Sequence, residues 1–71
     1  MPFPAVREGS PPTARELEIL GAYAARGSMK LTARALGISP DTVRRHLSNV
    51  RCRLGVDTTV QAIWILRDRI G

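Results

Sequence analysis

Residues 36–50 read LGISPDTVRRHLSNV, and this stretch decides the fold. Gly37 marks a turn, and Ser39 followed by Pro40 is a start signal for a helix. Serine is a favoured N-cap, and proline at the first helical position loses no hydrogen bond. Apolar residues then recur at spacings of four, three and four, at Val43, Leu47, Val50 and Leu54. The pattern predicts a helix over residues 39–54 that buries this stripe and ends at Gly55.

The side of this helix opposite the stripe is polar and cationic. It carries Asp41, Arg45, Ser48, Asn49 and Cys52, with Arg44 and Arg51 on one flank and His46 and Arg53 on the other. Arginine can bond to guanine O6 and N7, and serine or asparagine can bond to bases or phosphates. Flanking arginines match the phosphate walls of a groove. The helix therefore has an apolar stripe that holds it and a polar face that can read duplex DNA.

A second helix is predicted directly upstream, over residues 28–36. Ser28 is its expected N-cap and Gly37 its stop. Its expected apolar stripe is Leu31, Ala35 and Leu36, with Ala33 small enough for close contact. Two helices joined by a short turn that contains glycine form a helix-turn-helix, and the second helix of that unit normally lies in the major groove.

Helices are also predicted over residues 13–26 and 58–70, so the expected fold is all-α with four helices. The first begins with a capping box of Thr13 and Glu16. Its expected inward face is Leu17, Leu20 and Ala24, with Ile19 and Tyr23 beside them. The last helix is apolar nearly all the way round. A surface helix of a small monomer shows one apolar stripe, so we expect it to bury one face in the core and the other against a partner.

Length and charge limit the functional classes. The chain has 71 residues, which suit one small domain and leave little room for an enzyme with a walled pocket. Its 11 Lys and Arg against 6 Asp and Glu give a net charge of +5. This favours a polyanionic partner without separating DNA from RNA or an acidic membrane. With one Cys and one His, no disulfide, metal site or cofactor is expected, and no catalytic set surrounds His46.

The N-terminal residues 1–12 contain four of the five prolines and are predicted to be a flexible leader ahead of a domain over 13–71. They lack the features of a secretory signal, and no apolar run approaches the ~18 residues of a membrane helix. We therefore expect a cytoplasmic protein without a membrane partner.

Several motifs resemble the DNA-binding domains of the LuxR/GerE type. TARELEIL at 13–20 resembles the opening T-x-R-E-x-E-V-L of that family, and residues 36–50 resemble its L-G-I-S-x-x-T-V-x-x-H-x-x-N-I. RLGV at 53–56 is similar to K-L-G-V, and QAI at 61–63 to q-A-V. Residues 27–37 depart from the pattern, because they are one residue shorter than the family's G-L-S-N-K-E-I-A-x-x-L-G and lack E-I-A.

The resemblance implies a sequence-specific regulator of transcription whose third helix enters the major groove of double-stranded DNA. Carried over by position, Arg44, Arg45 and Ser48 would face bases, Thr42, His46 and Asn49 would lie near the backbone, and Arg51 would contact a phosphate. In the family the fourth helix often dimerises. Because the last helix has surplus apolar residues, we expect a homodimer through it, with an interface at Val60, Ile63, Trp64 and Arg67. The chain is similar to the stand-alone GerE type. RNA polymerase is a candidate further partner, and no small-molecule ligand is expected.

Two alternatives remain open on the sequence. A helix-turn-helix of this kind also occurs in sigma-factor-like subunits and in phage DNA-packaging or recombination proteins, which act only with a polymerase, terminase or integrase. A second alternative is a protein-interaction module that docks a partner through residues 58–70.

Overall fold

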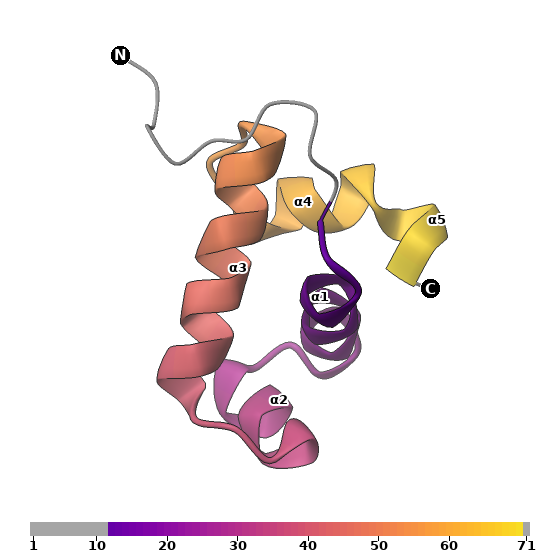
Figure 1. Ribbon diagram of the computed structural model, residues 1–71. Coiled ribbons are helices and arrows are strands. Elements are labelled where there is room, and N and C mark those ends of the chain that lie inside the picture. Colours follow the sequence, from indigo (N-terminus) through magenta and orange to yellow (C-terminus); the bar gives the residue numbers. More distant parts are fainter. Residues whose placement is uncertain (1–11, 71) are drawn as a thin grey trace.

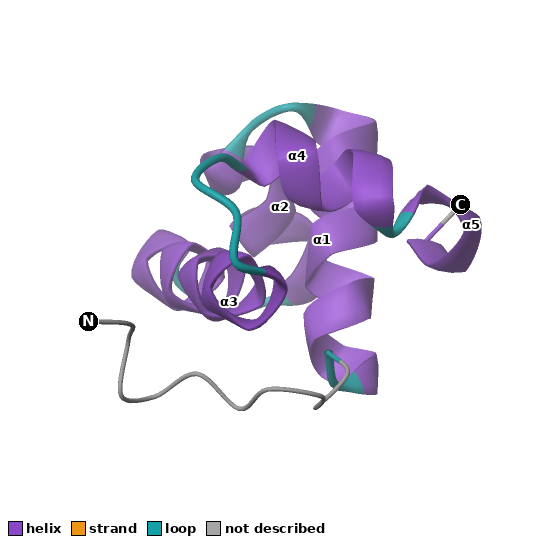
Figure 2. Cartoon of the chain, turned by 90° about the horizontal axis from the view of Figure 1, so that it is seen from above, coloured by secondary structure: helices purple, strands orange, loops and turns teal. Residues whose placement is uncertain are grey.

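The computed structural model describes residues 12–70, all of whose regular structure is helical (Figures 1 and 2). The helices are α1 (Ala14–Arg26), α2 (Met29–Leu36), α3 (Pro40–Leu54), α4 (Thr59–Ile65) and α5 (Arg67–Ile70). The predicted all-α class is confirmed. Of the predicted leader, only Pro12 falls within the described residues, and it is buried. Within 12–70, no helix combines the length and the apolar character that crossing a membrane would take.

Local capping chemistry sets the starts of the helices, as the sequence predicts. In the capping box of α1, the Thr13 hydroxyl accepts from the Glu16 N–H at 3.1 Å, and the Glu16 carboxylate accepts from the Thr13 N–H at 3.0 Å. Ser39 caps α3 by accepting from the Thr42 N–H at 3.1 Å. Gly37 closes α2 with a φ of 71°, a left-handed conformation that glycine adopts without strain. These local signals fix where the turn between α2 and α3 lies.

The five helices enclose one small core, and α1 lies at its centre, in contact with each of the others. Helix α3 runs along one side of the molecule, α2 packs against its N-terminal end, and α5 lies on the opposite side in both views (Figures 1 and 2). The predicted stripe of α3 is confirmed, because Val43, Leu47 and Val50 are fully buried. Leu54, the last residue of that stripe, is only partly buried against the core.

The predicted apolar face of α2 is only partly correct: Leu36 packs against the core as predicted, but the other two members of the stripe do not. Leu31 is 47% exposed and Ala35 is exposed, whereas Thr32 and Ala33 are buried. Thr32 can enter the core because its hydroxyl donates to the Ser28 carbonyl at 2.7 Å, which leaves only its methyl group to pack. The pattern of apolar residues missed this face because threonine counts as polar in the sequence.

The predicted inward face of α1 is largely confirmed, because Leu17 and Tyr23 pack against the core beside the buried Ile19 and Leu20. Glu16, Ile19 and Leu20 are its buried residues, and Ala24 is exposed. An alanine adds little apolar area, so the larger Ile19 and Leu20 determine which face turns to the core. The result places a charged residue, Glu16, inside the domain.

The predicted single helix over residues 58–70 is interrupted at Leu66, so that prediction is corrected to two helices. Leu66 has φ −100° and ψ 13°, outside the helical range, and its side chain is buried in the core. After this break α5 packs on α1, where the Ile70 carbonyl would lie 3.1 Å from a Cβ placed on Gly21. The Trp64 carbonyl accepts from the Arg67 guanidinium at 2.7 Å. Tertiary packing, rather than a local stop signal, therefore ends α4.

Candidate nucleic-acid interface

The outer face of α3 gathers the polar residues that the sequence predicts for it. Asp41, Arg44, Arg45, Ser48 and Asn49 are all exposed, and together with Arg51 they line one shallow open hollow on the surface. With 15 residues, α3 is about 22 Å long, and a helix of its width fits a major groove about 12 Å wide. No other described helix covers this face, as Figure 1 shows.

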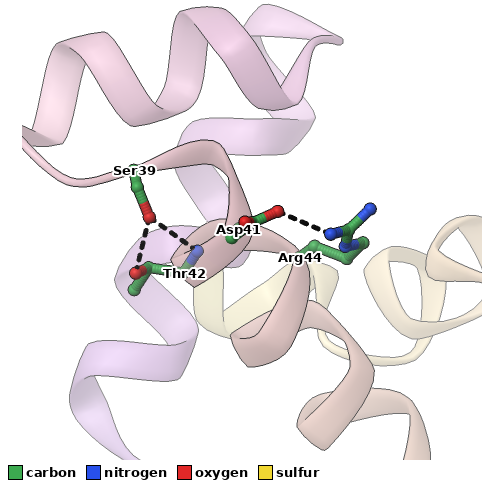
Figure 3. Close-up of polar contacts among 4 residues, drawn as sticks. All are labelled: Ser39, Asp41, Thr42 and Arg44. Atoms are coloured by element: carbon green, nitrogen blue, oxygen red, sulfur yellow. Dashed lines mark hydrogen bonds and ion pairs between the residues drawn. The ribbon is translucent and has the colours of Figure 1, made fainter.

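The N-terminal turn of α3 is held by the side chains of its own cap (Figure 3). Besides accepting from the Thr42 N–H, the Ser39 hydroxyl lies 2.9 Å from the Thr42 hydroxyl, and either group can donate. Thr42 is half-buried as a result. The structure thus places the predicted backbone-contacting Thr42 at the edge of the face, with its hydroxyl already engaged in the cap.

The two neighbouring arginines of this face differ in their surroundings. Arg44 forms an ion pair with Asp41 one turn earlier (Figure 3), and both side chains are largely exposed. Arg45 is exposed and has no ion pair or side-chain hydrogen bond within residues 12–70. Among the described residues Arg45 is therefore a free cation, whereas Arg44 is held in one direction along the helix.

Arg51, predicted to contact a phosphate, is partly engaged inside the domain. Its guanidinium donates to the Thr59 hydroxyl at 2.9 Å, which links the C-terminal half of α3 to the first residue of α4. The side chain is half-buried but still lines the hollow with Arg44 and Arg45. An arginine has several N–H donors, so this bond leaves others directed to solvent.

The flank of α3 opposite Arg44 and Arg51 faces inward more than predicted. His46 is half-buried, and its Nδ1 is buried without a hydrogen-bond partner among the described residues. Arg53 forms an ion pair with Glu16 of α1, with Nε and Oε1 3.2 Å apart and side-chain exposures of 16% and 5%. The Nε–H does not point at that oxygen well enough to make a hydrogen bond, so the contact is mainly electrostatic.

The Glu16–Arg53 pair was not foreseen from the sequence. One feature of the sequence could have indicated it: Glu16 lies next to the apolar residues of α1 that face the core. The same carboxylate accepts from the Thr13 N–H, so it both caps α1 and neutralises a nearly buried guanidinium. It thereby fixes the C-terminal half of α3 against the start of α1.

A second exposed surface lies on α4 and is apolar. Val60, Trp64 and Ile65 are 74%, 66% and 50% exposed, and they line a hollow with Val56 and Gln61. The Arg67 guanidinium lies 4.2 Å from the centre of the Trp64 ring, a cation–π contact. Of the residues predicted for a dimer interface, Val60, Trp64 and Arg67 are exposed, whereas Ile63 is partly buried against the core.

Sequence comparison places this geometry in a family. Residues 11–66 match the family described as bacterial regulatory proteins, luxR family. The chain belongs to the luxR family. A relative, the transcriptional regulatory protein MctR of Rhizobium johnstonii, is 44% identical over 59 residues, which cover 82% of this chain and 28% of MctR. The chain thus spans 28% of the length of that curated relative. No solved structure matches the chain.

The luxR-family match and the helix-turn-helix geometry agree with each other. The residues of the helix-turn-helix, from α2 through α3, lie wholly inside the matched segment. The chain carries the helix-turn-helix DNA-binding domain of this family, which is described as one of bacterial regulatory proteins. Among residues 12–70, no three His, Cys, Asp or Glu side chains gather closely enough to hold a metal ion.

Proposed function

We propose that the chain binds double-stranded DNA sequence-specifically by placing α3 in the major groove. The observation that supports this most strongly is the composition of the exposed face of α3. Arg44, Arg45, Ser48 and Asn49 are exposed side by side, and the opposite side of the helix is buried at Val43, Leu47 and Val50. A fixed backbone with free hydrogen-bonding side chains is what base recognition requires.

Within this face we assign base contacts to Arg45, Arg44 and Ser48, and backbone contacts to Asn49 and Arg51. Arg45 is the strongest candidate for a base, because it is exposed and has no partner within the described chain. Thr42 and His46 are half-buried at the edges of the helix, where they would meet the phosphate walls. Each phosphate that the protein neutralises makes the slope of log affinity against log salt more negative by roughly 0.9.

We further propose that two copies bind together through α4. The exposed side chains of Val60, Trp64 and Ile65 form an apolar surface, and Arg67 covers one side of the indole. Such a surface on a small domain is better explained by a partner than by contact with water. A two-fold dimer would set two α3 helices against half-sites about 10–10.5 base pairs apart or a multiple of that. As a regulator of a bacterial family, the protein would act in the cytoplasm, where the chromosome lies.

Fluorescence anisotropy with a labelled duplex of randomised sequence, over a series of salt concentrations, tests the assignment of the face. Arg44→Ala combined with Arg45→Ala removes two charges from it. Arg15→Ala combined with Arg69→Ala removes the same charge from α1 and α5, and α5 lies across the molecule from α3 (Figure 1). We expect the first variant to lose at least about tenfold in affinity and to show a shallower salt slope. The control should stay within about twofold of wild type. Equal losses in both variants would refute the assignment.

A further inference from the structure

Asp41 is the one acidic residue on a face that we propose for a polyanion. Its side chain is 82% exposed, it occupies the first turn of α3, and it lines the same hollow as Arg44 and Arg45. A carboxylate there is repelled by every phosphate, so charge attraction to DNA cannot explain it. In the first turn of α3, Asp41 interacts favourably with the helix dipole, and it also forms a contact with Arg44.

From this contact we infer that Asp41 is a positioning residue for base recognition, which orients Arg44 toward a guanine. The inference rests on the proposed binding of DNA by α3. Asp41 Oδ1 accepts from one Nη of Arg44 (Figure 3), which uses one N–H of the guanidinium and leaves the others free. Guanine O6 and N7 accept two parallel N–H bonds from an arginine. The pair thus combines a fixed direction with the donors that guanine needs.

The carboxylate also decides which part of the DNA Arg44 meets. A free arginine binds phosphate or guanine, since both accept two N–H bonds. When Arg44 approaches a phosphate, the carboxylate of Asp41 beside it is repelled by the phosphate charge. The guanine edge carries no net charge, so it does not repel the carboxylate in this way. Exclusion of water in the groove strengthens the Asp41–Arg44 contact, because the exposed pair is largely screened when the protein is free. Asp41 therefore acts against phosphate contact and in favour of the base.

Selection from a randomised duplex pool, followed by binding measurements on single-base variants of the recovered site, tests this. The chain is compared with Asp41→Asn, Asp41→Glu, Arg44→Ala and the double variant of Asp41→Asn with Arg44→Ala. Glu18→Gln is the matched control, because Glu18 forms an exposed ion pair with Arg15 at the same three-residue spacing on α1. Circular dichroism of each variant checks that the helices are retained.

We expect Asp41→Asn to reduce discrimination at one guanine of each half-site by about fivefold or more, with the other positions unchanged. The salt slope should become steeper by up to about 0.9, because Arg44 is then free to contact a phosphate. Asp41→Glu should restore part of that discrimination. In the Arg44→Ala background, Asp41→Asn should have no further effect on discrimination at that guanine. If Asp41 only stabilised the helix, its substitution would have the same effect with or without Arg44. Glu18→Gln should leave every base preference unchanged.

Two outcomes would overturn the inference. In the first, Asp41→Asn recovers the wild-type motif with the same discrimination at every position. In the second, its effect persists undiminished in the Arg44→Ala background, which would make Asp41 a base contact in its own right. Failure of the wild-type chain to select any motif would instead remove the proposed function, so the two failures are distinguishable.

Discussion

Glu16 offers the sharpest test of how the recognition helix is held in place. Its carboxylate is 5% exposed and lies 3.2 Å from Arg53 Nε while accepting from the Thr13 N–H at 3.0 Å. Glu16→Gln keeps the shape and the oxygen for the cap but removes the charge that faces Arg53. Glu16→Ala removes both contacts.

The two substitutions should differ in a predictable way. Leaving a fully buried charge unpaired costs about 3–5 kcal/mol, and an exposed pair is worth at most about 1 kcal/mol. The side chain of Arg53 is 16% exposed and can reach water. The loss of unfolding free energy in Glu16→Gln should therefore fall between these limits, at about 1–2 kcal/mol. Loss of the bond from the Thr13 N–H adds roughly 1 kcal/mol in Glu16→Ala, in which the Thr13 hydroxyl still caps the helix. For a domain of this size, each kcal/mol lowers the midpoint of thermal unfolding by about 4–8 °C.

Urea and thermal unfolding followed by circular dichroism measure both variants. Glu18→Gln, an exposed carboxylate on the same helix, is the matched control and should change stability by less than about 0.5 kcal/mol. Arg53→Met alone and combined with Glu16→Gln completes a double-mutant cycle. A cost below about 0.5 kcal/mol for Glu16→Gln, or additive costs in the cycle, would refute the reasoning.

Three further predictions concern binding, assembly and the turn. Arg45→Ala should cost about 1–3 kcal/mol in binding to the selected site and relax one base preference, as measured by anisotropy; an equal loss on all sequences would make Arg45 a phosphate contact. Trp64→Ala should shift the association equilibrium in sedimentation velocity toward monomer, whereas Leu31→Ala, an exposed apolar residue of α2, should not; identical behaviour of the two would argue against α4 as the interface. Gly37→Ala should cost about 1–2 kcal/mol in unfolding experiments, because φ is 71° and no neighbour lies within 4 Å to clash; an unchanged midpoint would show that the turn carries no such strain.

Local chemistry explains why much of the fold could be predicted from the sequence. The capping box of Thr13 and Glu16, the cap at Ser39 and the turn at Gly37 involve residues within a few positions of each other. The stripe of α3 follows helical spacing, so its polar face was also predictable. These features place the residues of the candidate site on one side of one helix.

Features that depend on contacts between distant residues could not be predicted. The break at Leu66 follows from the packing of α5 against Gly21 of α1, residues far apart in the sequence. The Glu16–Arg53 and Arg51–Thr59 contacts join different helices. Spacing along one helix carries no information about such partners.

The central claim is that α3 is the surface that contacts DNA. Titration of the ¹⁵N-labelled chain with its selected duplex, followed residue by residue in ¹H–¹⁵N NMR spectra, tests it most directly. We expect the largest changes in chemical shift at Arg44, Arg45, Ser48 and Asn49, with smaller ones along the rest of α3. Changes concentrated at Val60 and Trp64, with α3 unaffected, would contradict it and show that α4 is the binding surface.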